Sequence, residues 1–400
     1  MPGLASRLSA LSAPATIAMA IRARALRAEG HDVISLALGE PDFATPPHAV
    51  AAAHEAALAG QTKYPPIDGT AALKQAVRAK FARENGLDFA GNEIAVANGG
   101  KQILFNALMA TLDPGDEVVI PSPYWASYPL ITELLGGVPV FAECREADGF
   151  RLRPEALAAA IGARTKWVIL NFPNNPTGAI CPEDDLLALA RVLERHPDIW
   201  ILCDEIYEHM VFGETPHVSL GRVAPFLRDR LLTLNGVSKT YAMTGWRIGY
   251  AGGPANLIRA MSTIQSNSTS GASSVSQAAA VAALSGPQQG AAIMRDTYRR
   301  RRDLVVAALR AIPGLTCAMP DGAFYAYPGI RGCLGRTSAG GRRIATDDDF
   351  ALALLEEQHV ATVSGSAFGM SPYLRLSCAS SDTALSEACT RIARFCAELR

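Results

Sequence analysis

The chain has 400 residues, 49% of them hydrophobic, which is enough to build two packed domains. Its 37 basic and 38 acidic residues give a formal net charge of −1, so no overall field would attract nucleic acid or an anionic membrane. The eight cysteines form no C-x-x-C pair and the seven histidines no H-E-x-x-H motif, so we expect a reduced, cytoplasmic protein without a metal site. No apolar run reaches the ~20 residues of a transmembrane helix, and the stretch after Arg7 lacks the continuous apolar core of a signal peptide.

The N-terminal region is punctuated by Pro41-Asp42 and Pro46-Pro47, and beyond it strands and helices alternate regularly. Strands are predicted at residues 94–97, 117–120, 138–142, 167–170, 200–203, 231–234 and 248–251, with helices such as 102–112 and 184–193 between them. This alternation predicts an α/β fold with a mostly parallel sheet that helices cover on both faces.

After about residue 290 the alternation gives way to a long helix and an α+β pattern. We therefore predict a large domain over residues 46–290 and a small domain formed by both termini, residues 1–45 and 291–400. The long helix carries Arg299-Arg300-Arg301-Arg302, which we interpret as a solvated or intersubunit helix face. The Gly- and Arg-rich segment 331–343 is predicted to be a surface loop.

Polar segments follow five of the predicted strands, at the edge of an α/β sheet where ligands usually bind. They are Asn98-Gly99-Gly100-Lys101, Pro123-Tyr124-Trp125, the segment 171–178, Asp204-Glu205-Ile206-Tyr207 and Asn235-Gly236-Val237-Ser238-Lys239. The Gly-Gly turn could present backbone N–H groups to a phosphate, although such a turn often has no ligand. The dinucleotide fingerprint G-x-G-x-x-G and the P-loop are both absent from the sequence.

Three charged residues, two in these segments and one eight residues after the last segment, suggest chemistry. Asp204 ends an apolar run, where a carboxylate requires a cationic partner unless it simply caps the next helix. Lys239 lies in a loop of small residues and could form an imine with an aldehyde if its pKa is depressed. Arg247 would add a fixed cation suited to an anion. The aromatic residues Trp125 and Tyr207 could equally be packing residues.

Three motifs together are distinctive: the segment 238–249 (SKTYAMTGWRIG), Asn174-Asn175-Pro176-Thr177-Gly178 and Asp204-Glu205-Ile206-Tyr207. They resemble the class I aminotransferases, and the similarity extends from Gly39 to Arg375. The segment Gly99-Gly100-Lys101-Gln102 is most similar to the prokaryotic aspartate aminotransferases. This resemblance implies fold type I, with a mostly parallel seven-stranded sheet in the large domain and a small α+β domain. It also implies reversible amino transfer between L-aspartate and 2-oxoglutarate.

The resemblance assigns the catalytic roles. Lys239 would hold pyridoxal 5'-phosphate as a Schiff base and would move the proton at the substrate Cα. Asp204 would pair with the protonated pyridine nitrogen and keep the ring an electron sink. Tyr207 and Asn175 would form hydrogen bonds to the phenolic oxygen of the ring. Trp125 would stack on the ring face.

The same resemblance assigns the anion-binding roles. The cofactor phosphate would be held by Gly100, Lys101, Ser238 and Arg247, with Tyr64 reaching it from the other subunit of a homodimer. The substrate would be bound by Gly39, Trp125, Asn175, Arg375, Lys101 and Thr16. In that set Arg375 would grip the α-carboxylate as a two-pronged fork. The expected partners are amino acids and 2-oxo acids, with no nucleic acid and no membrane.

The sequence departs from its relatives at two places. Gly236 stands where relatives often have a phosphate-binding serine, and Ser238 could substitute for it. Near the N-terminus, Pro14 replaces a serine that borders the distal group of the substrate, while Thr16 and Lys101 remain. Relatives that accept prephenate carry a lysine at the position of Ser12, so we expect prephenate to be a poor substrate.

Other functions of the same fold remain open at this point. An aminotransferase for aromatic or other neutral amino acids, or a β-lyase, would share the cofactor motifs. A pyridoxal-phosphate-binding transcription regulator would carry an added N-terminal DNA-binding domain, whereas here the motifs begin by Gly39. Hydrolases with G-x-S-x-G and dehydrogenases with G-x-G-x-x-G are disfavoured because both motifs are missing.

Overall fold

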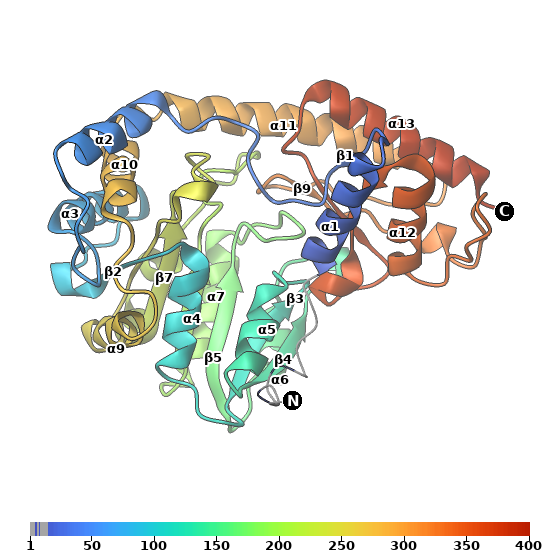
Figure 1. Ribbon diagram of the computed structural model, residues 1–400. Helices are drawn as coiled ribbons and strands as arrows, with labels where there is room; N and C mark the ends of the chain where they lie inside the picture. Colours follow the sequence, from blue (N-terminus) through green and yellow to red (C-terminus); the bar gives the residue numbers. More distant parts are fainter. Residues whose placement is uncertain (1–4, 6–7, 9–14) are drawn as a thin grey trace.

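The computed structural model describes residues 5, 8 and 15–400 (Figure 1). Its centre is a seven-stranded sheet in the order β2-β8-β7-β6-β5-β3-β4. The strands are β2 (Ile94–Ala97), β3 (Glu117–Ser122), β4 (Val138–Glu143), β5 (Thr165–Asn171), β6 (Trp200–Asp204), β7 (Leu231–Gly236) and β8 (Gly249–Gly252). β8 is antiparallel to both of its neighbours, and the other adjacent pairs are parallel. The prediction of a mostly parallel seven-stranded sheet is therefore confirmed.

Both faces of this sheet are buried, as expected for a parallel sheet with helices on its two sides. Alternate residues of a strand face opposite ways, so Val168 and Leu170 of β5 join one hydrophobic cluster and Trp167 and Ile169 another. The first cluster includes α7 (Glu183–Glu194) and the second includes α4 (Gly100–Met109) and α9 (Ala255–Ser266). The remaining helices of this region are α2 (Pro47–Leu58), α3 (Ala71–Lys80), α5 (Ser127–Leu134), α6 (Pro154–Ala160), α8 (Leu220–Val223) and α10 (Ser274–Ser285).

A second group of elements combines segments from both ends of the chain. It contains α1 (Ala15–Ala28), β1 (Ile34–Ser35), α11 (Gln289–Arg310), β9 (Tyr325–Ala326), α12 (Asp347–Gln358), β10 (Val360–Ala361), β11 (Val363–Ser364), β12 (Leu374–Ser377) and α13 (Asp382–Glu398). β1 pairs in parallel with β10, and β11, β12 and β9 form a three-stranded sheet. Figure 1 shows the long helix α11 reaching from the α2 and α10 side of the molecule to this group.

The arginine run on α11 is partly buried, so its interpretation as a solvated face is wrong for two of its four residues. Arg301 and Arg302 are buried, whereas Arg299 and Arg300 are exposed. Arg301 Nη1 lies 2.9 Å from both carboxylate oxygens of Asp42, and its Nε donates to Asp382 at 2.8 Å. These partners neutralise a charge that burial would otherwise make costly.

Segment 331–343 is largely exposed, as predicted. Among the residues described, no helix is both long and apolar enough to span a bilayer.

Candidate active site

A pocket of about 430 Å³ opens where the polar segments after β2, β3, β5, β6 and β7 meet residues from both ends of the chain. Eleven of the residues proposed from the sequence line it. These are Gly39, Gly100, Lys101, Trp125, Asn175, Asp204, Tyr207, Ser238, Lys239, Arg247 and Arg375. The parallel strands explain this convergence, because their carboxyl ends lie on the same edge of the sheet.

Lys239 projects into the pocket from the turn after β7, and its Nζ donates a hydrogen bond to Gly39 O at 2.6 Å. The pKa of Lys239 is lowered to about 8, and burial is the largest cause. The positive charges of Arg375 and Arg247 also lower it, and they outweigh the opposing effect of Glu40 and Asp204. A larger fraction of this amine is therefore neutral, and hence nucleophilic, than of an exposed lysine.

Asp204 ends β6 and is 6% exposed. Burial raises its pKa to about 6, although hydrogen bonds from Tyr128 to Oδ2 (2.7 Å) and from the Ile206 N–H to Oδ1 (3.1 Å) oppose the rise. A turn follows Asp204 where the capping interpretation requires a helix. The carboxylate can therefore still bind a cation at its pocket side.

The turn after β2 is packed closely against Arg247 and against Gly249 of β8. A Cβ on Gly99, whose φ is +87°, would lie 2.4 Å from Arg247 Nη2, and one on Gly249 would lie 2.3 Å from Gly100 N. Arg247 is held by hydrogen bonds from Nη1 to Thr244 O at 2.8 Å and from Nη2 to Asn98 O at 3.3 Å. Lys101 lies in the first turn of α4, which begins at Gly100. Two cations and a helix N-terminus thus form an anion-binding corner.

Arg375 on β12 is 3% exposed, and no carboxylate pairs with it in the described part of the chain. Its Nη1 donates to Asn175 Oδ1 at 3.0 Å and its Nη2 to Ala37 O at 2.6 Å. Its guanidinium lies 4.6 Å from the Tyr325 ring centre, while Nε is buried without a hydrogen-bond partner among the described residues. A buried guanidinium with a free donor is suited to bind an anionic group that enters the pocket.

Tyr64 is the proposed residue that the structure places outside this pocket. Tyr64 is 96% exposed, so within one chain it is no part of the site. Thr16 lies in α1, but its side chain is outside the described part, as are Ser12 and Pro14.

Several lining residues were missed by the sequence interpretation. They include Glu40, Tyr128, Asn171, Thr244 and Tyr325. Tyr128 follows Trp125 by three residues, in the first turn of α5, and the two ring centres lie 5.3 Å apart, so its closeness to Trp125 was an available signal. Tyr325 comes from β9, and its hydroxyl lies 2.8 Å from that of Tyr207. No local motif marks Tyr325, because this contact joins residues 118 positions apart.

Comparison with known proteins is consistent with this geometry. The family model described as aminotransferase class I and II matches residues 31–392. An aspartate/prephenate aminotransferase of Cereibacter sphaeroides is 54% identical over 100% of both chains, and an aspartate aminotransferase of Rhizobium meliloti is 53% identical over 99% of this chain and 96% of its own.

Solved structures agree. The crystal structure of an aspartate aminotransferase from Rhizobium meliloti has a TM-score of 0.97 and 52% identity over 100% of both chains. An aspartate aminotransferase from Thermus thermophilus with maleate has a TM-score of 0.92 and 43% identity, over 99% of this chain and 100% of that one. The expected fold and the expected transaminase class are both confirmed. The chain belongs to the family of class I and II aminotransferases.

Proposed function

We propose that this enzyme is a pyridoxal-phosphate-dependent aminotransferase that transfers the amino group reversibly between L-aspartate and 2-oxoglutarate. The observation that carries the proposal is the meeting of three groups in one pocket: a lysine of lowered pKa, a buried carboxylate and a buried arginine with a free donor. The names of the most similar relatives support aspartate as the amino donor.

The residues present fit the cofactor. The glycine turn and the cations Lys101 and Arg247 suit its phosphate, and the buried carboxylate of Asp204 suits a protonated pyridine nitrogen. When bound, pyridoxal 5'-phosphate supplies an aldehyde that condenses with amines and a ring that accepts the electron pair left at the substrate Cα. Lys239 would carry it covalently, and Ser238 would assist at the phosphate.

Other residues would orient the ring and the substrate. Trp125 would cover one ring face, while Tyr207 and Asn175 would donate hydrogen bonds to the phenolic oxygen. Arg375 would bind the α-carboxylate together with Asn175 and the backbone of Gly39. The neutral amine of Lys239, once released, would move a proton at the substrate Cα.

Lys101 and Thr16 would receive the distal carboxylate of an acidic substrate. Lys101 lines the pocket with its Nζ 5.0 Å from the Trp125 ring centre, and burial together with the charge of Arg247 lowers its pKa. We expect Lys101→Ala to reduce kcat/KM for aspartate about 10- to 100-fold, because it removes a charge-assisted hydrogen bond, and to affect phenylalanine less. Steady-state kinetics with both donors measure this ratio, and an equal loss for both would restrict Lys101 to the cofactor phosphate.

The proposal extends to the assembly. We propose a cytoplasmic homodimer in which residues 46–290 form the large domain and both termini the small one. Tyr64 would serve the neighbouring site, since its side chain points to solvent in the single chain. A second copy would thus complete each pocket.

The test of the function is a half-reaction with single amino acids. The yellow holoenzyme is mixed with aspartate, glutamate or phenylalanine, and the absorbance change that marks amino transfer to the cofactor is recorded. Aspartate and glutamate should react fastest. A faster reaction with phenylalanine would replace the proposal by an aminotransferase for aromatic amino acids, and no reaction with any amino acid would reject amino transfer.

Prephenate provides a further comparison, because the Cereibacter sphaeroides relative is named for it as well. Ser12 leaves this chain without the lysine that prephenate-using relatives carry there. We therefore expect kcat/KM for prephenate to be well below that for 2-oxoglutarate. Comparable values would show that another cation takes the place of that lysine.

A further inference from the structure

The segment after β6 presents side chains to two sides. Asp204 and Tyr207 line the pocket, whereas Glu205 and Glu208 are buried among other polar residues. These two glutamates belong to a group of residues linked by hydrogen bonds and ion pairs, which we call the Lys80 cluster. It consists of Lys80, Glu84, Asn85, Glu205, Glu208, His209, His217, Ser219 and Asn235. It lies directly behind residues proposed to act on the cofactor.

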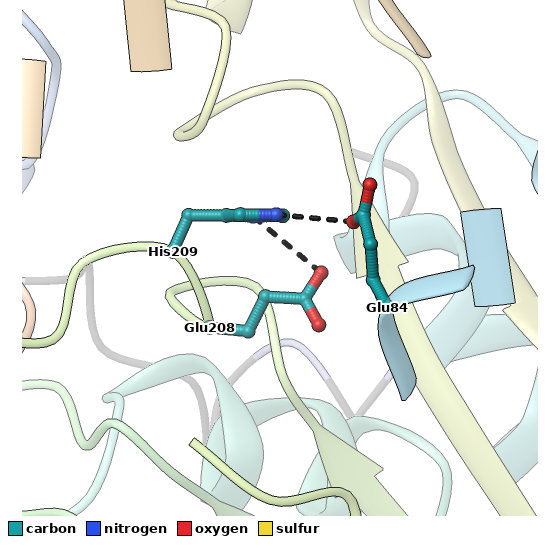
Figure 2. Close-up of side chains that lie close together, drawn as sticks. All are labelled: Glu84, Glu208 and His209. Carbon is teal, nitrogen blue, oxygen red and sulfur yellow. Dashed lines mark hydrogen bonds and ion pairs between the residues drawn. The ribbon is translucent and has the colours of Figure 1, made fainter. Parts of the chain in front are cut away.

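Part of this cluster resembles a metal site, since Glu84, Glu208 and His209 bring their ligand atoms within 4.8 Å of one another (Figure 2). Lys80 supplies the positive charge at this point, because its Nζ contacts Glu208 Oε1 and lies 3.6 Å from Glu84 Oε2. It also donates to Asn85 Oδ1 at 2.7 Å. We therefore interpret this part of the cluster as a buried ion-pair network and not as a metal centre.

Within it, the ring of His209 makes two directed contacts. Nε2 lies 3.1 Å from Glu84 Oε2, and Nδ1 lies 3.1 Å from Thr240 Oγ1. Glu208 Oε1 is farther from Nδ1, at 3.6 Å; Figure 2 shows the ring between the two glutamates. Burial would raise the pKa of Glu84, but the hydrogen bond from His209 and the charge of Lys80 hold it below its ordinary value. The imidazole ring therefore bridges Glu84 on one side and the Thr240 hydroxyl on the other.

Thr240 directly follows Lys239 and is 2% exposed. The turn that carries both is closed by long backbone hydrogen bonds: Tyr241 N to Val237 O at 3.3 Å, Ala242 N to Lys239 O at 3.4 Å and Met243 N to Ser238 O at 3.2 Å. Backbone bonds are usually near 2.9 Å and weaken as they lengthen. The contact to His209 adds a side-chain hydrogen bond at Thr240 to this turn, whose residues Val237, Tyr241 and Met243 are packed in the core.

We propose that His209 is a positioning residue for Lys239, which it holds in reach of the cofactor by fixing Thr240. The inference rests on the proposed role of Lys239. His209 contacts neither the cofactor position nor the substrate position, and it acts through the turn. Losing it should slow the attachment of the cofactor to Lys239 and lower kcat, while substrate binding at Arg375 stays intact.

The two ring nitrogens can be removed separately. An asparagine amide reaches about as far as Nδ1, and a glutamine amide about as far as Nε2. His209→Asn should thus keep the Thr240 contact, whereas His209→Gln should keep only the Glu84 contact. The full-length protein is stripped of cofactor and remixed with pyridoxal 5'-phosphate, and the rate of the absorbance rise is recorded beside kcat, KM for aspartate and the melting temperature.

We expect His209→Gln and Thr240→Val to lower both the attachment rate and kcat about 10-fold with little change in KM, because small displacements of a reacting group are costly. His209→Asn and Thr240→Ser should remain near wild type. The double variant that combines His209→Gln with Thr240→Val should lose no more than either single variant, since both changes break one contact.

Two results would overturn the inference: equal rates in His209→Asn and His209→Gln, or losses that follow the melting temperature alone. A failure of the proposed role of Lys239 would be seen in a different experiment. Borohydride reduction would then leave no pyridoxyl label on Lys239, either in the wild-type holoenzyme or in the His209 variants.

Discussion

At the residue scale, burial acts in opposite directions on the two groups central to the pocket. It lowers the pKa of Lys239 to about 8 and raises that of Asp204 to about 6, because each charged form loses hydration. Both shifts favour neutral groups in the cofactor-free protein. A cationic ring nitrogen beside Asp204 would restore a charge pair at that position.

The lowered pKa of Lys239 predicts how cofactor uptake depends on pH. Attachment requires the neutral amine, so the uptake rate of the cofactor-free protein should rise about tenfold per pH unit and level off above about pH 8. Stopped-flow absorbance from pH 6 to 10 measures it. Arg375→Leu removes a charge that lowers this pKa, so its plateau should begin at higher pH. A wild-type rate still rising at pH 10 would contradict the prediction.

Asp204 gives a second prediction at this scale. Asp204→Ala should fold and bind cofactor but lose at least 100-fold in kcat, because a neutral pyridine ring stabilises negative charge at Cα poorly. Asp204→Glu should retain more activity, since it keeps the carboxylate. Turnover with saturating aspartate and 2-oxoglutarate measures the loss, and near-normal turnover in Asp204→Ala would reduce the residue to a structural role.

Site residues that follow a strand could be placed from the sequence, because the edge of a parallel sheet gathers them regardless of their separation. Lys239 and Asp204 are of this kind. Tyr325 and Glu40 could not, since they reach the pocket from segments outside the central sheet. Their positions depend on tertiary packing and not on any local pattern.

At the element scale, strong apolar runs made the seven central strands predictable to within a few residues. The two-residue strands β1, β9, β10 and β11 are too short to show a period, and their pairing with remote segments defines them. The exposure of the arginine run on α11 was predicted wrongly for a related reason. Its charge pattern suggests exposure, but Arg301 is neutralised by Asp42, which lies 259 positions away.

The end of α3 offers a stability prediction. Lys80 is fully buried and contacts Glu208. Burial alone would raise the pKa of Glu208, but the charges of Lys80, His209 and His217 lower it to about 2. Lys80→Met should reduce the free energy of unfolding at pH 7 by about 3–5 kcal/mol, because it removes the lysine charge that compensates the buried carboxylate of Glu208. Chemical denaturation measures this loss.

The pH dependence follows from the sign of that shift. A lowered pKa contributes stability above the ordinary value near 4.5, and this stability is lost as pH falls toward about 2. The difference between wild type and Lys80→Met should therefore shrink below about pH 4.5. Combining Lys80→Met with Glu208→Gln should recover most of the loss at pH 7. A constant difference across this range would mean that Lys80 stabilises by packing alone.

At the scale of the whole molecule, the single chain leaves one proposed residue unexplained. Tyr64 is 96% exposed although the resemblance assigns it to a phosphate site, and a large exposed aromatic residue often marks a contact surface. Phosphate binding by Tyr64 of the partner subunit accounts for both facts. The sequence could suggest this role only through family resemblance, since no pattern in one chain reports a contact with a second copy.

Mixed dimers test this arrangement. Lys239→Ala and Tyr64→Ala should each lower activity strongly, the first by removing the cofactor's attachment and the second by weakening phosphate binding. Unfolding and refolding the two together makes dimers with one chain of each kind. In such a dimer one pocket combines the intact Lys239 of one chain with the intact Tyr64 of the other, and the second pocket carries both changes. With random pairing, half of the dimers are mixed and half of their pockets are intact, so about a quarter of wild-type activity should return. Because neither variant alone can gain from refolding, a mixture no more active than the average of its parents would place Tyr64 outside its neighbour's site.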